Sequence, residues 1–302
     1  MSPTEAEGFT KDEDILKGFG SPEEAPWHES LDSITKVEIL EGEGNAKIVP
    51  SKMTYLFAGL SQLENMTGLS YIDTSVVGNM SHLFDGDEAL KSLDLSSFNT
   101  SQATNMSSMF LDTYKLENIA LSDNFTTSFN VDFSSMFSDC GSQTTSGVTI
   151  TNFKNSIKTI NAETMSNMFY HAKFASADFT GFSTAKVTNF SSMFQDFKQQ
   201  NSTDLDLSSF CNAAATNVES MFADCANLTT IYANPAIWQR SKTYSGSNTF
   251  NGCYALVGTN KDESYSLHHG QDTTYDSSDY AYICESESKP GLFTPLPEPT
   301  AY

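Results

Sequence analysis

The sequence predicts a solenoid, a fold in which short similar units stack into one elongated core. The string Asn-Met-Ser-Ser-Met-Phe returns eight times, with variations, along the 302 residues. Its apolar positions keep a fixed spacing, and a short run of alternating apolar residues follows most copies. Because a unit of this size cannot bury its own apolar face, stacked neighbours must cover it.

The repeated string predicts a single helical or 3-10 turn in each unit. Each copy ends in Phe, and most copies carry apolar residues one and four positions earlier, which places them on one side of such a turn. Asn or Asp often precedes the first apolar position and suits an N-cap. These cap residues are Asn79, Asn105, Asp132, Asn189 and Asn217. The eight repeat phenylalanines are Phe57, Phe84, Phe110, Phe137, Phe169, Phe194, Phe222 and Phe250.

The second part of each unit predicts a short strand with one buried face. One copy matches the leucine-rich-repeat pattern L-x-x-L-x-L-x-x-N at every fixed position, with Leu116, Ile119, Leu121 and Asn124. Other copies are centred on Leu93/Leu95, Val148/Ile150, Leu205/Leu207 and Ile231/Ala233. In the Val148 and Leu205 copies the strand lies two residues further from its phenylalanine, which predicts a small insertion. The predicted fold class is a leucine-rich-repeat-like solenoid, with short parallel strands on one face and single helical or 3-10 turns and loops on the other.

A low-complexity chain rich in Ser and Thr could also repeat by chance. Seven of the eight units keep an apolar residue four positions before the Phe, and only Gly246 departs, so we reject that alternative. We expect an acidic leader at 1–26, an N-terminal cap at 27–50, the repeat solenoid at 51–258, and a C-terminal cap and tail at 259–302. For the leader, disorder and a cap over the first unit both remain open.

The charge balance excludes several classes of partner. The chain has 38 acidic and 16 basic residues, a net charge of -22, and no apolar run long enough to span a membrane. Nucleic acids and anionic membranes need a basic footprint, so we expect neither as a partner, and no membrane insertion. No signal peptide is recognisable after Met1, and we expect either a cytoplasmic protein or a segment of an exported one.

The repeats resemble the BspA-like leucine-rich-repeat surface proteins of bacteria, a group with units of about 26 residues. The resemblance runs from about Trp27 to Phe293 and rests on the SSMF strings, the two LDLSSF strings at 93–98 and 205–210, and Asn248–Gly258. It implies an extracellular or cell-surface location and a role in adhesion or partner binding. It implies no common ligand.

The sequence favours no catalytic, metal or cofactor chemistry. It contains no nucleophile elbow, phosphate-binding loop or zinc-protease motif, so we expect no enzyme and no cofactor. Asp85-Gly86-Asp87-Glu88 lacks the spacing of a full calcium loop, and an ordinary turn is favoured. The pair His268 and His269 gives little support for a metal site, since neighbours on a strand point to opposite faces. For Cys140, Cys225 and Cys253, which each lie three residues after a repeat phenylalanine, a buried ladder is favoured, while a Cys253–Cys284 disulfide remains open.

A ligand would bind where the strands face solvent. The residue between the two buried positions of each strand points outward, which predicts a ladder of Asp94, Ala120, Thr149, Asp178, Asp206 and Tyr232. The residues that we select as partner-binding are Ser92, Asp94, Asn118, Asp178, Asp204, Asp206 and Tyr232. This small, polar and acidic surface suits a host or cell-surface protein or a glycan. A merely solvated face, on a structural spacer without a ligand, is the alternative.

Overall fold

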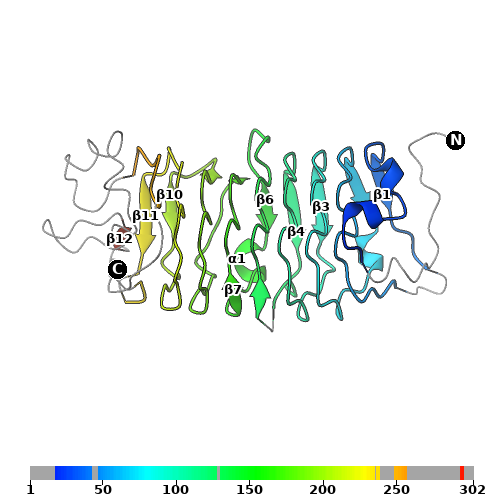
Figure 1. Ribbon diagram of the computed structural model, residues 1–302, viewed down its shortest axis with the longest axis horizontal. Helices are drawn as coiled ribbons and strands as arrows, with labels where there is room; N and C mark the ends of the chain where they lie inside the picture. Colours follow the sequence, from blue (N-terminus) through cyan, green and yellow to red (C-terminus); the bar gives the residue numbers. More distant parts are fainter. Residues whose placement is uncertain are drawn as a thin grey trace, which may run out of the picture.

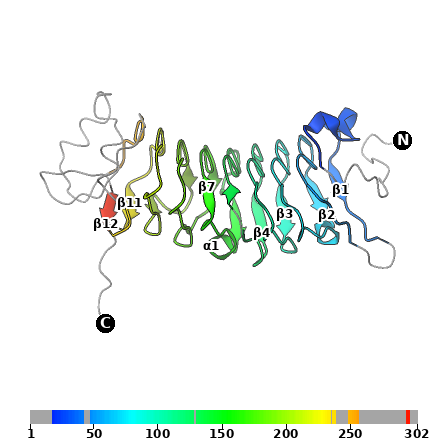
Figure 2. The ribbon, with the colours of Figure 1, turned by 60° about the horizontal axis from the view of Figure 1, so that its bottom comes forward.

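The structure, a computed structural model, describes residues 18–42, 47–127, 130–234, 236–238 and 248–256, and the backbone of 293–295. It is a parallel β-solenoid with little helix, which confirms the predicted fold class. Successive coils lie side by side along one axis, with β1 at one end and β11 and β12 at the other (Figures 1 and 2). Here a coil means one complete turn of the solenoid.

Every strand pair in the described part is parallel and joins neighbouring coils. The strands form separate short sheets, in the orders β1-β2, β3-β4-β6, β5-β7, β8-β9 and β10-β11-β12. Their bounds are β1 Lys36–Glu38, β2 Asn65–Thr67, β3 Ser92–Leu95, β4 Asn118–Leu121, β5 Val131–Asp132, β6 Thr149–Thr151, β7 Ala162–Thr164, β8 Lys173–Phe174, β9 Lys198–Gln199, β10 Asp204–Asp206, β11 Thr230–Ala233 and β12 Phe293–Pro295. The helical segments are the 3-10 turns η2 Pro22–Glu24, η3 His28–Ser30 and η5 Leu69–Tyr71, and the single-turn α1 Phe153–Ser156.

The register of β6 differs from the prediction. Ile150 pairs with Ile119, and Thr151, not Thr149, lies beside Ala120. The insertion in this coil is therefore four residues, since Ile150 follows Phe137 by 13 positions and Ile119 follows Phe110 by nine. The extra residues lengthen the connection through 141–147, so the strand starts later than the repeat pattern indicated.

The repeated Met-x-x-Met-Phe segment forms consecutive β-turns rather than a helical turn. In the coil of Phe57, the N–H of Leu56 donates to the carbonyl of Met53, as in a 3-10 turn, but Tyr55 inside that turn has φ of 54°. A left-handed residue interrupts a right-handed helix. Alternate N–H groups then donate to the next coil, as Phe57 does to Leu83. Positive φ recurs two residues before and two residues after all eight repeat phenylalanines.

The predicted cap residues lie where these turns begin. Side-chain oxygens of Asn79, Asn105, Asp132, Asn189 and Asn217 each accept the N–H of the residue two positions later, at 2.8–3.0 Å. Each cap therefore closes a local Asx-turn. The prediction that these residues cap the turn is confirmed, although the turn itself is not helical.

The eight repeat phenylalanines stack in one continuous column through the core. Successive ring centroids lie 5.1–5.8 Å apart, and successive rings are within 14° of parallel. Beside Phe169, the rings of Phe174 and Phe179 pack edge-on against the column. Offset stacking and edge-to-face packing are the arrangements that aromatic rings favour, so each coil locks to its neighbours.

A column of buried threonines lies at a further bend of the coils, apart from the strands and the repeated turns. The sequence analysis did not predict it. The hydroxyl of Thr184 donates to the carbonyl of Cys211 at 2.8 Å and accepts its N–H at 2.7 Å. Thr74 makes the same two bonds with Asn99, and Thr159 makes them with Ser183. Each threonine thus satisfies backbone groups of the next coil at a bend, where no strand ladder reaches them.

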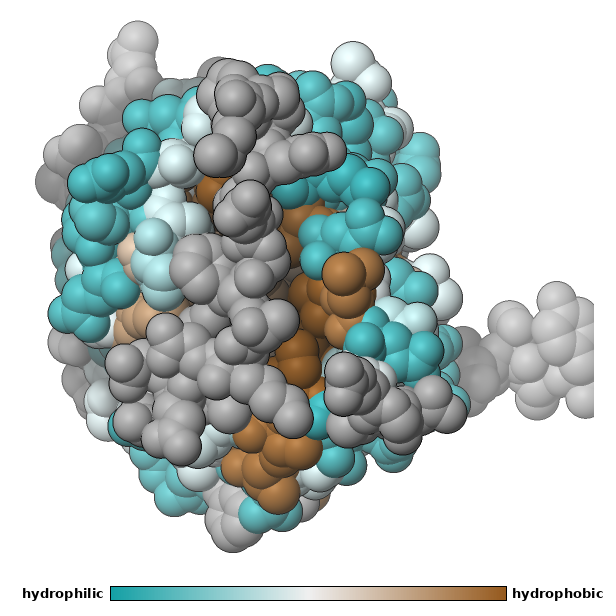
Figure 3. Space-filling model, turned by 90° about the vertical axis from the view of Figure 1, so that its right-hand side faces the viewer, coloured by the Kyte–Doolittle hydropathy of each residue, from teal (hydrophilic) through white to brown (hydrophobic). Residues whose placement is uncertain are grey.

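The N-terminal end of the solenoid is only partly covered in the described residues. Segment 19–34, with η2 and η3, packs its buried Phe19, Ala25 and Ile34 against the first coil. Ile48 is nevertheless 38% exposed, whereas Ile72, its bridge partner one coil further in, is 3% exposed. This end presents apolar surface inside a polar rim (Figure 3).

Some predicted features lie outside the described residues. These are residues 1–17 of the leader, the 259–302 ending apart from the backbone of β12, the pair His268 and His269, and Cys284. Among the residues that are described, no helix is long and apolar enough to cross a membrane.

Candidate functional site

The predicted binding residues lie in two groups on the outward side of the strands, which we call the strand face. In the first group, Ser92 and Asp94 of β3 pair with Asn118 and Ala120 of β4. Ser92, Asp94 and Asn118 are exposed, while Leu93 and Ile119, which lie between the outward positions, are buried. The predicted alternation of buried and outward positions is confirmed in these strands.

The second group lies on β10 and β11. Asp204 pairs with Thr230, and Asp206 pairs with Tyr232. All four side chains are half-buried, whereas Leu205 and Ile231 between them are buried. The prediction that Asp206 and Tyr232 lie side by side is therefore confirmed. This group is separate from the first, because β6 lies between β4 and β10 (Figure 1), and β8 and β9 also lie between the two groups in the chain.

Asp178 does not join the predicted ladder. It lies outside any strand, and its carboxylate forms an ion pair with Lys154 of α1 at 3.1 Å. The coil from Phe169 to Phe194 is the shortest of the array, and its strand β8 already begins at Lys173. Asp178 therefore follows the strand instead of lying within it, and the prediction that places it in the strand ladder is wrong.

The strand-face aspartates also shape the backbone. Oδ1 of Asp94 accepts the N–H of Ser96 at 3.0 Å, and Oδ1 of Asp206 accepts the N–H of Ser208 at 2.9 Å. Hydrogen bonds from the Ser96 hydroxyl and N–H hold the pKa of Asp94 below its ordinary value, so it is ionised at neutral pH. An aspartate here closes a turn and still presents a charge to solvent.

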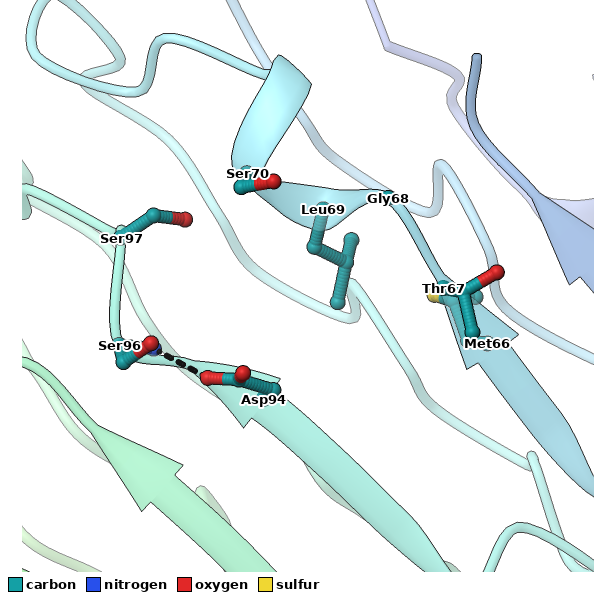
Figure 4. A pocket seen from close by; sticks show the side chains of 8 residues that line it. All are labelled: Met66, Thr67, Gly68, Leu69, Ser70, Asp94, Ser96 and Ser97. Carbon is teal, nitrogen blue, oxygen red and sulfur yellow. Dashed lines mark hydrogen bonds between the residues drawn. The ribbon is translucent and has the colours of Figure 1, made fainter. Parts of the chain in front are cut away.

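A pocket of about 220 Å³ lies beside Asp94, between the ends of β2 and β3 (Figure 4). One wall comes from β2 and η5 and the other from the turn that follows β3. Buried Met66 and Leu69 supply apolar lining. The remaining lining residues are Thr67, Gly68, Ser70, Asp94, Ser96 and Ser97.

The pocket exists because the sheet is interrupted between these two coils. β2 pairs only with β1, and no backbone hydrogen bond joins β2 to β3, although all residues of both strands are described. Gly68 also follows β2 at the position that Leu95 holds in the next coil, so an apolar side chain is missing there. Gly68 has φ of 81°, and a Cβ atom would lie 1.9 Å from the carbonyl oxygen of Ile39. The close approach of the first coil therefore requires glycine.

The polar groups of the pocket are available to a ligand. The side chains of Thr67, Ser70 and Ser97 are exposed, and their hydroxyls have no hydrogen-bond partner in the described part of the chain. With ionised Asp94, they offer three hydroxyls that can donate or accept and one carboxylate that accepts. The arrangement suits recognition of a small group rich in hydroxyls, and sequence reasoning found only Asp94 of this set.

A second polar surface, which the sequence reasoning missed, follows the turn edge near the repeat phenylalanines. His82 contacts Asp85 at 2.7 Å, and its ring stacks on Tyr55 with centroids 4.3 Å apart. Burial, together with the neighbouring Asp112 carboxylate, raises the pKa of Tyr114 to about 12. The signal for this surface is the recurring Gly, Asp or His two residues after each repeat phenylalanine. These groups largely pair with one another, so we do not select them as the site.

The cysteine slot is buried as predicted. Cys140, Cys225 and Cys253 are at most 4% exposed, and each is a free thiol. The Sγ atoms of Cys225 and Cys253 donate to the carbonyls of Phe194 and Phe222 in the preceding coils, at 2.9 Å each. Asp87 occupies the same slot, fully buried. Within the described residues, no group of three His, Cys, Asp or Glu side chains is placed to hold a metal ion.

Comparison with known families gives one match. Residues 45–153 and 142–261 each match the family described as Mycoplasma protein of unknown function, DUF285. The two matches together span most of the chain and overlap at residues 142–153, which include β6. No curated protein and no solved structure is significantly similar to the chain.

Proposed function

The chain belongs to the DUF285 family, and we propose that it is a noncatalytic binding module that uses its strand face to bind a protein or glycan partner. The observation that carries the proposal is the contrast between the two sides of each strand. Inward positions are buried without exception in β3, β4, β10 and β11, while outward positions present carboxylates, an amide and hydroxyls.

The proposal extends to location and group. The two LDLSSF strings and the SSMF turns support placement among the BspA-like surface proteins, and hence an extracellular or cell-surface location. The acidic character of the strand face suits basic or hydroxylated partners and disfavours polyanions. In many repeat proteins the solenoid provides the rigid scaffold and its surface residues provide specificity.

The test is a binding screen of the full chain against immobilised glycans, mucins and matrix proteins. We expect at least one partner whose binding weakens roughly tenfold in the double variant Asp94→Asn and Asp206→Asn, since each substitution removes a charge-assisted contact. Asparagine is required here because its Oδ1 can still accept the N–H of Ser96 or Ser208, whereas alanine would open both turns.

Asp73→Asn is the matched control. Asp73 lies off the strand face and closes the same kind of turn, with Oδ1 accepting the N–H of Ser75 at 3.0 Å. It should bind like the unmodified chain. The absence of any partner, or a partner indifferent to the double variant, would favour a structural spacer and contradict the proposal.

A further inference from the structure

We propose that the pocket between β2 and β3 is a subsite for one neutral sugar residue at the exposed end of a glycan. This inference rests on the proposed function and names the ligand class for one part of the strand face. It concerns Thr67, Ser70, Asp94 and Ser97, which are among the lining residues that Figure 4 draws.

The size of the pocket favours a single ring. At about 220 Å³ it lies below the range of about 300–1,000 Å³ that is usual for drug-sized ligands. A polypeptide strand would also need a continuous edge, and β2 offers only the three residues Asn65–Thr67 before Gly68 and η5 turn the chain away. The site therefore suits a compact group that enters from solvent.

The polar lining favours a group with several hydroxyls. A sugar hydroxyl both donates and accepts, and so do the hydroxyls of Thr67, Ser70 and Ser97. The carboxylate of Asp94 adds a strong acceptor, because its Oδ1 bond to the Ser96 N–H fixes the orientation of the group. Buried Met66 and Leu69 provide an apolar wall for the C–H groups of the ring.

The charge favours a neutral ligand over an anionic one. Asp94 is ionised, and no lysine or arginine lines the pocket. Lys91, which immediately precedes β3, forms an ion pair with Glu64 at 2.7 Å. A sialic acid or a uronic acid would place its carboxylate near the carboxylate of Asp94 without a compensating cation. Two like charges that lie close together repel each other.

The missing backbone ladder between β2 and β3 leaves backbone groups with which a ligand can form further hydrogen bonds. A parallel strand leaves N–H and C=O groups along its unpaired edge, and β2 and β3 turn such edges toward each other across the gap. No other part of the first group on the strand face has this feature, because β3, β4 and β6 are joined by continuous ladders. The gap thus distinguishes the pocket from the rest of the first group.

The test uses methyl glycosides of neutral hexoses, of N-acetylhexosamines and of sialic acid as probes, with the full chain and saturation-transfer difference NMR. We expect a signal from at least one neutral glycoside and none from the sialic acid. Affinity should fall at least roughly tenfold in Asp94→Asn, which removes the charge, and in Thr67→Val, which removes a hydroxyl but keeps the β-branched shape. Ser97→Phe should abolish the signal by filling the pocket.

Asp73→Asn is again the matched control, because Asp73 lies off the strand face, closes the same kind of turn and does not line the pocket. It should bind the glycoside like the unmodified chain. Failure of every neutral glycoside, or binding that survives Ser97→Phe in a folded variant, would overturn the subsite. If the immobilised screen still finds a partner sensitive to Asp206, the proposed function stands while the subsite falls.

Discussion

Oδ1 of Asp87 accepts the N–H of Leu60 from the neighbouring coil at 3.0 Å, inside the core. Asp87 is fully buried, and its Oδ2 has no hydrogen-bond partner in the described structure. Burial raises the pKa of Asp87 well above its ordinary value, and nearby Asp85 adds to the effect. An acidic residue thus stands in a column that Thr113 and Cys140 continue.

This carboxyl should make stability depend on pH in a defined direction. The folded chain binds the Asp87 proton more tightly than the unfolded chain, so the free energy of unfolding should fall as pH rises from the unfolded pKa through the raised folded pKa. In Asp87→Asn that contribution is absent, while an amide oxygen can still accept the Leu60 N–H. We expect the variant to be at least as stable as the unmodified chain at pH 8, with the advantage shrinking as pH falls to 5.

Urea unfolding at several pH values measures this difference directly. Comparing the variant with the unmodified chain cancels the groups whose pKa values are lowered, such as Asp94 and Asp73. Asp87→Leu serves as a second control, because it also removes the titration but leaves the Leu60 N–H without its acceptor. If the free energy of unfolding changes with pH in the same way for Asp87→Asn and for the unmodified chain, the pKa of Asp87 is not raised by folding, and the prediction is wrong.

The phenylalanine column should be most sensitive to substitution at its centre. Phe169 stacks between Phe137 and Phe194, at 5.7 and 5.5 Å, and is also packed edge-on by Phe174 and Phe179. Truncating it in Phe169→Ala should cost about 3–5 kcal/mol, as for other large core residues. Phe57 at the end of the column has one stacked neighbour in the described repeat series and is 7% exposed, so Phe57→Ala should cost less. Equal losses in chemical denaturation would contradict a continuous column.

Replacing Thr184 by valine, its apolar isostere, should lower the stability of the fold. Thr184→Val removes the hydroxyl that both donates to the Cys211 carbonyl and accepts the Cys211 N–H. Leaving buried polar groups unpaired should cost about 1–3 kcal/mol for each. Thr184→Ser keeps the hydroxyl and should recover much of that loss. A valine variant as stable as the serine variant in thermal unfolding would show that water replaces the hydroxyl at this bend.

The sequence could predict those features of the fold that repeat from one coil to the next. The apolar positions of the turns and strands repeat because the same column is buried in every coil, so Phe137 and Leu93 were assigned to the core directly. Side-chain direction in a strand has a period of two, however, and a shift of two residues leaves every face unchanged. Val148 and Ile150 therefore fit the pattern equally well, and only the pairing of Ile150 with Ile119 distinguishes the two registers.

The pocket could not be predicted for a different reason. It depends on a ladder that is missing between β2 and β3, and on Gly68 at a position where another coil has leucine. A repeat pattern predicts what neighbouring coils share, whereas the pocket arises where two of them differ. Asp94 was selected because it points outward, but its neighbours Thr67 and Ser70 come from another coil and from outside the repeat pattern.

Gly68 should be the least replaceable glycine of the strand side. Its φ of 81° strains any L-residue, and a Cβ atom would collide with the Ile39 carbonyl oxygen at 1.9 Å, a backbone atom that cannot move aside alone. Gly68→Ala should therefore separate the first coil from the second and lower the midpoint of thermal unfolding. Gly78→Ala is the control, because the nearest atom to its Cβ would be the Gln102 carbonyl oxygen at 3.8 Å and its φ is not positive. If both variants melt like the unmodified chain, the close contact between Gly68 and Ile39 does not hold the first coil in place.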